Sequence, residues 1–317
     1  MRRPDLRVVG ALLFVQATFG AFHVVGRGVL EVLPPLAVAG LRVAVAAPLL
    51  LVVAWRVDRI VPPRRELPSL ALLGLLGVFA NQLLYIVGLG MTTATNAAIL
   101  MPSIPAFALM VAAGAGIERL TRRTVAGVGL AVAGAVVMLD PSRFAAGAGT
   151  TAGNLLVLAN CLSYATYLVL QRPVLRRLPP LTVIAWAFLF GGAGVLAVTA
   201  PTLARLHPAA VPGAVWAGMA YIVLIPTAVN YALNTWAIRR SSPSLVAAFT
   251  TLQPVFTAAL AVVFLGERPG VHELAGFLLI AAGLAAISGR RRGGAAPPPA
   301  PSSPPGRGES PRTARRG

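Results

Sequence analysis

The sequence contains few of the residues on which soluble enzymes and metalloproteins rely. Its 317 residues include nine Asp and Glu, three His, one Cys and no Lys. A single cysteine, Cys161, can form neither an intrachain disulfide nor a cysteine metal cluster. The HExxH, CxxC and GxxxxGK[ST] patterns are missing, so we expect no metal, no cofactor and no direct use of ATP. No ionisable pair lies at a common depth in the apolar runs, which argues against an intramembrane enzyme.

Charge is scarce as well. Only 11% of the residues are charged and 57% are hydrophobic, whereas an ordinary soluble domain has about 25% charged residues. The formal charge of +18 would suggest a nucleic-acid partner in a soluble chain, but here the arginines fall in short gaps between apolar runs. We therefore expect membrane lipids and no nucleic acid around this chain. The use of Arg alone, with abundant Ala, Gly and Pro, favours GC-rich coding and a bacterial source.

Long apolar runs dominate what is present. Stretches of about 20 residues, the length that an α-helix needs to cross the hydrocarbon core, recur ten times. They predict an all-α polytopic membrane protein with ten transmembrane helices, at about 6–26, 36–55, 68–90, 94–115, 124–140, 151–171, 181–200, 213–237, 243–265 and 271–289. Residues 290–317 are rich in Pro, Gly, Ser and Arg and predict a disordered basic tail.

The positions of the arginines predict the orientation, because positively charged loops stay in the cytoplasm. With the N-terminus inside, 22 of the 27 arginines fall in inner segments, four fall in outer segments, and Arg42 lies within a helix. This asymmetry favours a cytoplasmic-membrane protein whose N- and C-termini are both cytoplasmic.

The chain also matches itself at an offset of 149 residues. Asn81 aligns with Asn230, Pro105 with Pro254, and the dipeptide Glu118-Arg119 with Glu267-Arg268. Five helices per copy is an odd number, so the second copy must enter the bilayer from the opposite side. The sequence therefore predicts two inverted five-helix repeats, residues 6–140 and 151–289, with a binding site where they meet.

These repeats resemble a known family. In both halves a Pro within an apolar helix is followed thirteen positions later by Glu-Arg, and then by a helix with Gly nine and sixteen residues beyond the Glu. This pattern resembles the EamA domain of the drug/metabolite transporter superfamily, over about residues 8–288. The chain departs from the family at Phe19-Gly20, where Trp-Gly is often found. The resemblance implies a ten-helix carrier of small metabolites, often an exporter, with a central cavity.

Polar residues at mid-membrane depth are the candidates for lining that cavity, because hydrocarbon makes an unpaired polar group costly. The third and eighth predicted helices each carry polar residues at i, i+1 and i+4, which share a helix face. The sixth predicted helix adds a similar face. The candidates are Asn81, Gln82 and Tyr85; Asn230, Tyr231 and Asn234; and Asn160, Tyr164 and Tyr167. Hydrogen bonding between helices is the alternative explanation for each of them.

Such a lining suits an amino acid, a neutral metabolite or an aromatic compound better than a polyphosphate. We expect such a small-molecule substrate to be carried by alternating access. The alternative is a membrane scaffold or sensor that transports nothing and uses its basic tail to bind anionic lipid.

The charged and small residues leave several alternatives open. Glu118 and Glu267 could bond the neighbouring arginine or the first free N–H groups of the next helix, or could form gating ion pairs with Arg119 and Arg268. His23 is either structural or a proton relay, so proton coupling is an open alternative. Arg42 must find a carbonyl or acidic partner, or reach the interface.

The glycines at the repeat offset have a simpler interpretation. Gly127 and Gly134 lie seven residues apart on one helix face, and Gly276 and Gly283 match them in the second half. This spacing predicts close packing between helices.

Overall fold

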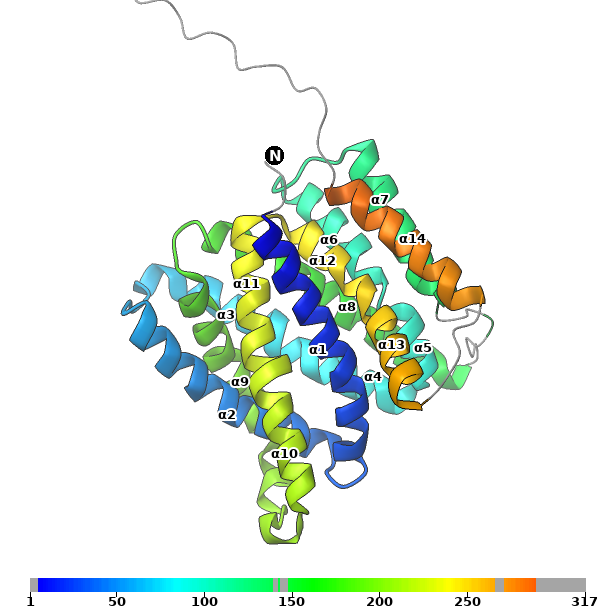
Figure 1. The fold of residues 1–317 in the computed structure, drawn as a ribbon. Coiled ribbons are helices and arrows are strands. Elements are labelled where there is room, and N and C mark those ends of the chain that lie inside the picture. Colours follow the sequence, from blue (N-terminus) through cyan, green and yellow to red (C-terminus); the bar gives the residue numbers. More distant parts are fainter. Residues whose placement is uncertain (1–4, 139–141, 143–147, 266–270, 289–317) are drawn as a thin grey trace, which may run out of the picture.

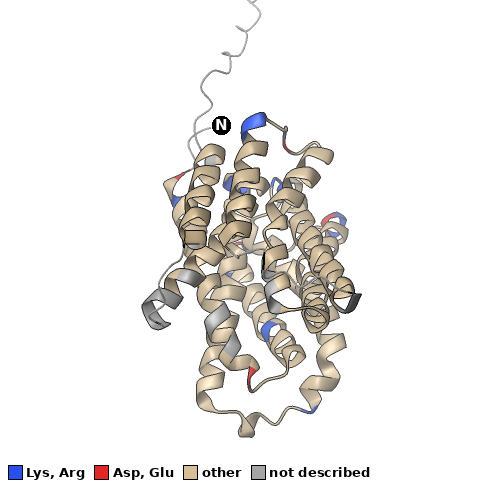
Figure 2. Ribbon diagram, turned by 90° about the vertical axis from the view of Figure 1, so that its right-hand side faces the viewer, with Lys and Arg blue, Asp and Glu red and all other residues tan. Residues whose placement is uncertain are grey.

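The computed structural model describes residues 5–138, 142, 148–265 and 271–288. The regular structure of these residues is entirely helical (Figure 1). The predicted tail, 290–317, and the dipeptide Glu267-Arg268 lie outside the described residues. Figure 2 shows that most of the ribbon carries no charged residue.

The first half contains seven α-helices, one short 3-10 helix and one stretch of wider π-helical turns. Its elements are α1 (Leu6–Leu30), α2 (Pro35–Val57), η1 (Arg64–Glu66), α3 (Leu67–Gly74), η2 (Leu75–Ala80, the π-helical stretch), α4 (Asn81–Met91), α5 (Ala94–Leu100), α6 (Ser103–Gly114) and α7 (Arg122–Met138). Elements η1 to α4 follow one another without a break, so they form a single long helix.

The second half repeats this order with few differences. Its elements are α8 (Ala148–Val174), α9 (Pro180–Ala204), η4 (Pro208–Ala210), α10 (Gly213–Ile222), η5 (Val223–Val229, also π-helical), α11 (Asn230–Arg240), α12 (Pro243–Phe249), η6 (Thr250–Leu252), α13 (Gln253–Leu265) and α14 (Val271–Ser288). Helix α8 starts at Ala148, three residues before the predicted boundary at 151.

Several helices are long and apolar enough to cross a membrane. Within the described residues these are Pro35–Val57, Arg64–Met91, Thr150–Val174, Pro180–Ala204 and Gly213–Arg240. Shorter apolar helices cover Leu6–Phe22, Ser103–Gly114 and Leu274–Ile287. The chain is thus a multi-pass membrane protein, and helical segments coincide with all ten apolar ranges predicted above.

Two of the predicted continuous helices are interrupted. The range 94–115 breaks between α5 and α6, and the range 243–265 changes to η6 between α12 and α13. Pro105 lacks the N–H that would bond the carbonyl of Met101, and Pro254 lacks the one that would bond Thr250. Because proline also crowds the carbonyl four residues before it, each helix breaks one turn ahead of its proline.

The two halves correspond element by element at the 149-residue offset. The π-helical stretches η2 and η5 occupy equivalent positions, and α4 and α11 start at the equivalent residues Asn81 and Asn230. The N-caps also match: the hydroxyl of Thr93 accepts from an N–H of α5, and that of Ser242 accepts from one of α12. Equivalent sequence positions therefore adopt the same local structure.

Equivalent helices also pack against each other in antiparallel pairs. Helices α7 and α14 lie side by side (Figure 1), with Gly127 opposite Gly283 and Gly134 opposite Gly276. A Cβ on Gly134 would lie 2.7 Å from the carbonyl oxygen of Gly276. The prediction that these glycines serve close packing is confirmed.

Three carboxylates connect the two halves at one end of the helices. Asp58 accepts hydrogen bonds from the N–H and the hydroxyl of Thr182, at 2.9 and 2.7 Å. Glu66 is buried and forms a bidentate ion pair with Arg177, at 2.8 and 3.0 Å. Glu118 accepts from the N–H of Ser244 at 3.1 Å. These three interactions, called the cross-half polar contacts below, involve segments that the arginine pattern assigns to one side.

Candidate functional site

Four aromatic side chains meet in the interior, and we call them the aromatic cluster: Tyr164 and Tyr167 of α8, Phe188 of α9 and Tyr231 of α11. The ring of Tyr231 packs edge-on against Phe188, with 5.1 Å between ring centroids. Its centroid lies 6.4 Å from that of Tyr167 and 6.5 Å from that of Tyr164. Tyr167 and Phe188 are fully buried. The cluster is an aromatic wall built by three helices of the second half.

The first half reaches this wall through a glycine. A Cβ at Gly77 of η2 would overlap the ring of Tyr167, so only glycine lets the helix backbone approach the ring this closely. At the repeat offset Gly77 corresponds to Pro226 of η5. The aromatic cluster therefore lies at the junction of the two halves.

Several buried polar atoms without a hydrogen-bond partner lie on the helices that form the cluster or contact it. They include the hydroxyl of Tyr167, Oδ1 of Asn234, Oγ1 of Thr235, Oε1 of Gln82 and both polar atoms of the Gln171 amide. Asn234 lies beside Tyr164, and Thr235 lies beside Tyr167. Because burying an unpaired polar group costs about 1–3 kcal/mol in proteins, such a concentration of them is typical of a binding site.

The predicted candidates divide into two groups. Asn230 is fully buried and uses both of its polar atoms to contact α1: its Oδ1 accepts from Thr18 at 3.0 Å, and its Nδ2 donates to the carbonyl of Val15. Asn160 donates to the backbone carbonyl of Asn81 at 2.5 Å. These two asparagines make interhelical hydrogen bonds, whereas Gln82 and Asn234 retain unpaired oxygens. The side chains of Asn81 and Tyr85 are half-buried.

Arg42 of α2 lies among the helices near the cluster. Its Nε donates to the hydroxyl of Thr227 in η5 at 3.0 Å, and its guanidinium lies 5.5 Å from the ring centroid of Phe22. Thr227 itself stands four residues before Tyr231 on the same continuous helix. The acidic partner that the sequence left open is not among the described residues, whose ion pairs within 4.0 Å involve Glu66 with Arg65 and Arg177.

The first predicted Glu-Arg pair, Glu118 and Arg119, does not form an ion pair within itself in the described structure. The Glu118 carboxylate bonds the N–H of Ser244 near the start of α12, a helix of the other half rather than the next helix in the chain. Arg119 is exposed and is in no ion pair that the described residues form. The side chain of His23, like Glu267 and Arg268, lies outside the described part.

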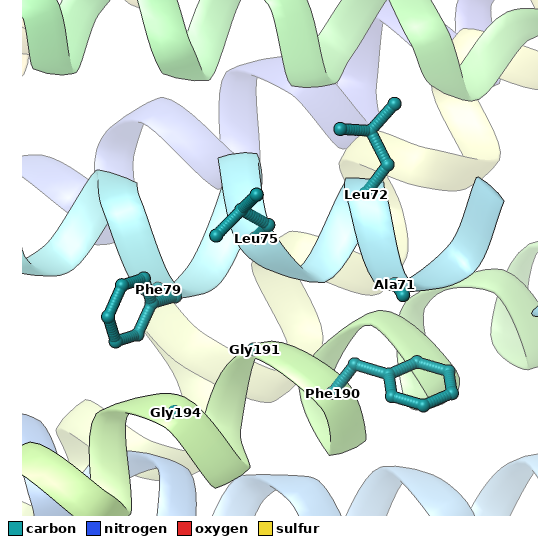
Figure 3. A pocket seen from close by; sticks show the side chains of 7 residues that line it. All are labelled: Ala71, Leu72, Leu75, Phe79, Phe190, Gly191 and Gly194. Carbon is teal, nitrogen blue, oxygen red and sulfur yellow. The ribbon is translucent and has the colours of Figure 1, made fainter. Parts of the chain in front are cut away.

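Two grooves occur elsewhere on the molecule. One, of about 450 Å³, lies between α9 and the α3–η2 segment and is lined by Ala71, Leu72, Leu75, Phe79, Phe190, Gly191 and Gly194 (Figure 3). Its lining is apolar, and Leu72 and Leu75 are exposed, as expected of a surface that faces lipid. The other, of about 250 Å³, is lined by Arg172, Leu175, Arg176 and Arg239. Neither groove includes a predicted candidate.

Sequence reasoning missed two residues of the site. Phe188 belongs to a uniformly apolar helix, so nothing in the sequence separates it from its neighbours. Thr235 follows Asn234 and lies four residues after Tyr231, so the polar face of α11 could have included it.

Comparison with known proteins agrees with this architecture. The model of the EamA-like transporter family matches twice, at residues 7–140 and 151–289. The chain is 30% identical to the Arabidopsis thaliana protein WALLS ARE THIN 1, over 86% of this chain and 80% of that protein. It is 32% identical to a probable terminal-alkyne amino-acid exporter of Streptantibioticus cattleyicolor, over 80% of this chain and 84% of that protein.

The fold is known from crystallography as well. A crystal structure with 19% sequence identity superposes with a TM-score of 0.75, covering 89% of this chain and 96% of the other. With a multi-pass helical fold, a repeat in sequence and structure, and a family match over both halves, the chain belongs to the EamA-like transporter family of the drug/metabolite transporter superfamily.

Proposed function

We propose that this protein is a ten-span carrier that moves a small metabolite out of the cell across the cytoplasmic membrane. Its two five-helix halves, 6–140 and 151–289, have inverted orientations and alternate in exposing a central site to either side. Both termini are cytoplasmic. The substrate is an amino acid, a neutral metabolite or an aromatic compound, and the exporter of Streptantibioticus cattleyicolor named above supports an amino-acid-like solute.

One observation carries this proposal: the aromatic cluster with its unpaired polar atoms at the junction of the two halves. The tyrosine and phenylalanine rings offer apolar and π surfaces. Oε1 of Gln82 and Oδ1 of Asn234 have no partner in the described protein, so a polar solute can gain hydrogen bonds there. A site at the junction of inverted halves is also where carriers of this architecture bind their solutes.

Metabolite comparison in cells tests the function. Metabolites inside and outside cells that produce the protein are compared with those of cells that produce an Asn234→Leu variant. We expect at least one small metabolite to accumulate outside with the wild type and not with the variant, since losing the hydrogen bond weakens binding about 5- to 150-fold. An unchanged metabolite profile, with folded protein in the membrane, would favour the scaffold or sensor alternative.

The neighbouring asparagine provides a matched control. Asn230 lies one turn before Asn234 on α11, but its polar atoms already bond α1. Asn230→Leu should therefore lower thermal stability in detergent, by about 1 kcal/mol, while the folded fraction still exports. Asn234→Leu should show the reverse: normal stability and impaired export. If Asn230→Leu abolishes export by a folded carrier, the predicted role of Asn230 in lining the cavity is correct.

A further inference from the structure

Arg42 is a cation inside an apolar helix that is long enough to span the membrane, Pro35–Val57. Its partner Thr227 lies halfway along the 28-residue span Gly213–Arg240. At about 1.5 Å per residue, Thr227 is roughly 20 Å from either end of a helix that crosses about 30 Å of hydrocarbon. Arg42 itself is the eighth residue of α2, about 10 Å from the Pro35 end of that helix.

The described protein groups that contact Arg42 are uncharged. Thr227 accepts one hydrogen bond from Nε and donates its own hydrogen to the carbonyl of Ile222 at 2.7 Å. Phe22 contributes a ring face. A guanidinium has five N–H donors, and within the described residues only the Nε–H of Arg42 has an acceptor.

None of the carboxylates that the structure describes forms an ion pair with Arg42. They stand at or beyond the ends of helices: Asp5, Glu31, Asp58, Glu66 and Glu118. An unneutralised charge at this depth is costly, and charges of this kind in membrane proteins mark substrate or ion paths. The missing counter-ion is therefore expected to come from outside the protein.

We propose that Arg42 binds the carboxylate of the transported solute, and that the aromatic cluster holds the solute's apolar or aromatic part. This inference rests on the proposed carrier function and assigns the substrate class of the same site. Thr227, which accepts from Arg42, stands four residues before Tyr231 on the same continuous helix, and this connects the charge to the cluster. The four Nη hydrogens form the planar fork that matches a carboxylate. One arginine balances one carboxylate, whereas a polyphosphate would need further cations.

Matched solutes test this assignment. Full-length protein is reconstituted in liposomes, and the counterflow rate of each solute is measured separately. The rate for L-phenylalanine is compared with that for L-phenylalaninamide, and the rate for phenylacetate with that for phenylacetamide. Each pair differs in the carboxylate and keeps the aromatic ring. We expect at least one carboxylate to move, and to move about tenfold or more faster than its amide, because charge-assisted hydrogen bonds discriminate to that extent.

Variants on the same helix identify the residue. Arg42→Gln should remove the preference for the carboxylate, Arg42→Lys should retain part of it, and Arg56→Gln, at an exposed arginine near the end of α2, should leave it unchanged. The ratio of carboxylate to amide transport is the readout because general damage to the fold would lower both rates alike.

The possible results separate this inference from the carrier function. If the amides move as fast as the carboxylates, or if folded Arg42→Gln keeps the preference, Arg42 is structural and the inference fails. It also fails if the metabolites exported by cells lack a carboxylate, although the carrier function then stands. If no probe moves and no metabolite is exported, both proposals are wrong.

Discussion

At the scale of single residues, the Glu66–Arg177 ion pair shows how a rare carboxylate is used. Glu66 is 4% exposed, and its two oxygens accept from Nε and Nη2 of Arg177. The Arg177 side chain is 48% exposed. The buried carboxylate thus depends on a partly solvated arginine, 111 positions away in the chain.

Removing that arginine should destabilise the folded protein. Arg177→Gln leaves a buried carboxylate without its bidentate partner, which we expect to cost about 1–3 kcal/mol because the arginine is only half-buried. The melting temperature of the purified protein in detergent measures this effect. Arg176→Gln, at the exposed neighbouring position, should leave the melting temperature unchanged, and equal effects of both substitutions would argue that the ion pair contributes nothing.

At the scale of helices, close packing between equivalent helices depends on missing side chains. Along α7, the buried Gly127 and Gly134 meet the backbone of α14, whereas Gly129 is exposed and has open space where a Cβ would lie. The difference comes from the helical period, which turns Gly129 away from the partner helix. Gly134 therefore has no room for a larger side chain, whereas Gly129 on the same helix has room for one.

These glycines predict opposite outcomes for the same substitution. Gly134→Ala places a methyl group 2.7 Å from both the carbonyl oxygen of Gly276 and the backbone nitrogen of Ile280, so α7 and α14 must separate at a cost of about 1–3 kcal/mol. Gly129→Ala should be neutral or slightly stabilising because alanine favours helix. Thermal melting of both variants tests this, and equal melting temperatures would contradict the packing described.

At the scale of the whole molecule, hydrogen bonds and an ion pair join helix ends that the arginine pattern assigns to the same side of the membrane. The cross-half polar contacts join segments assigned to the inner side, and the hydrogen bond of 2.6 Å between Thr92 and Asn154 joins segments assigned to the outer side. These contacts establish which segments share a face. Which face is cytoplasmic follows from the positive-inside rule alone.

Cysteine labelling tests the orientation. In a Cys161→Ala background, single cysteines at Ser69 and Thr121 should be protected from an impermeant thiol reagent in intact cells. A cysteine at Ser142 should react, because the arginine asymmetry places this residue outside. Permeabilised cells serve as the control for accessibility. Reaction at Ser69 and Thr121 together with protection at Ser142 would reverse the topology.

The sequence predicted the features that depend on local pattern. Hydropathy gave the helical ranges, and the 149-residue offset identified the glycine pairs, because both are regular along the chain. It could not separate Asn230 from Asn234, since the difference lies in Thr18 and Val15 of α1, which approach only one of them. Phe188 was missed for the same reason: its role depends on which side chains meet it from α11.

Among the described residues, the two ends of the molecule differ in the charge of the contacts between the halves. At the repeat offset Glu66 corresponds to Val215, so the second half has no copy of this ion pair, and the described contacts of Asn154 with Thr92 and Asn96 at the other end are uncharged. Two halves with identical contacts would give two end states of equal free energy. Under the alternating access proposed above, the cross-half polar contacts must break before the end where they lie opens, so we predict that the state in which that end is shut has the lower free energy.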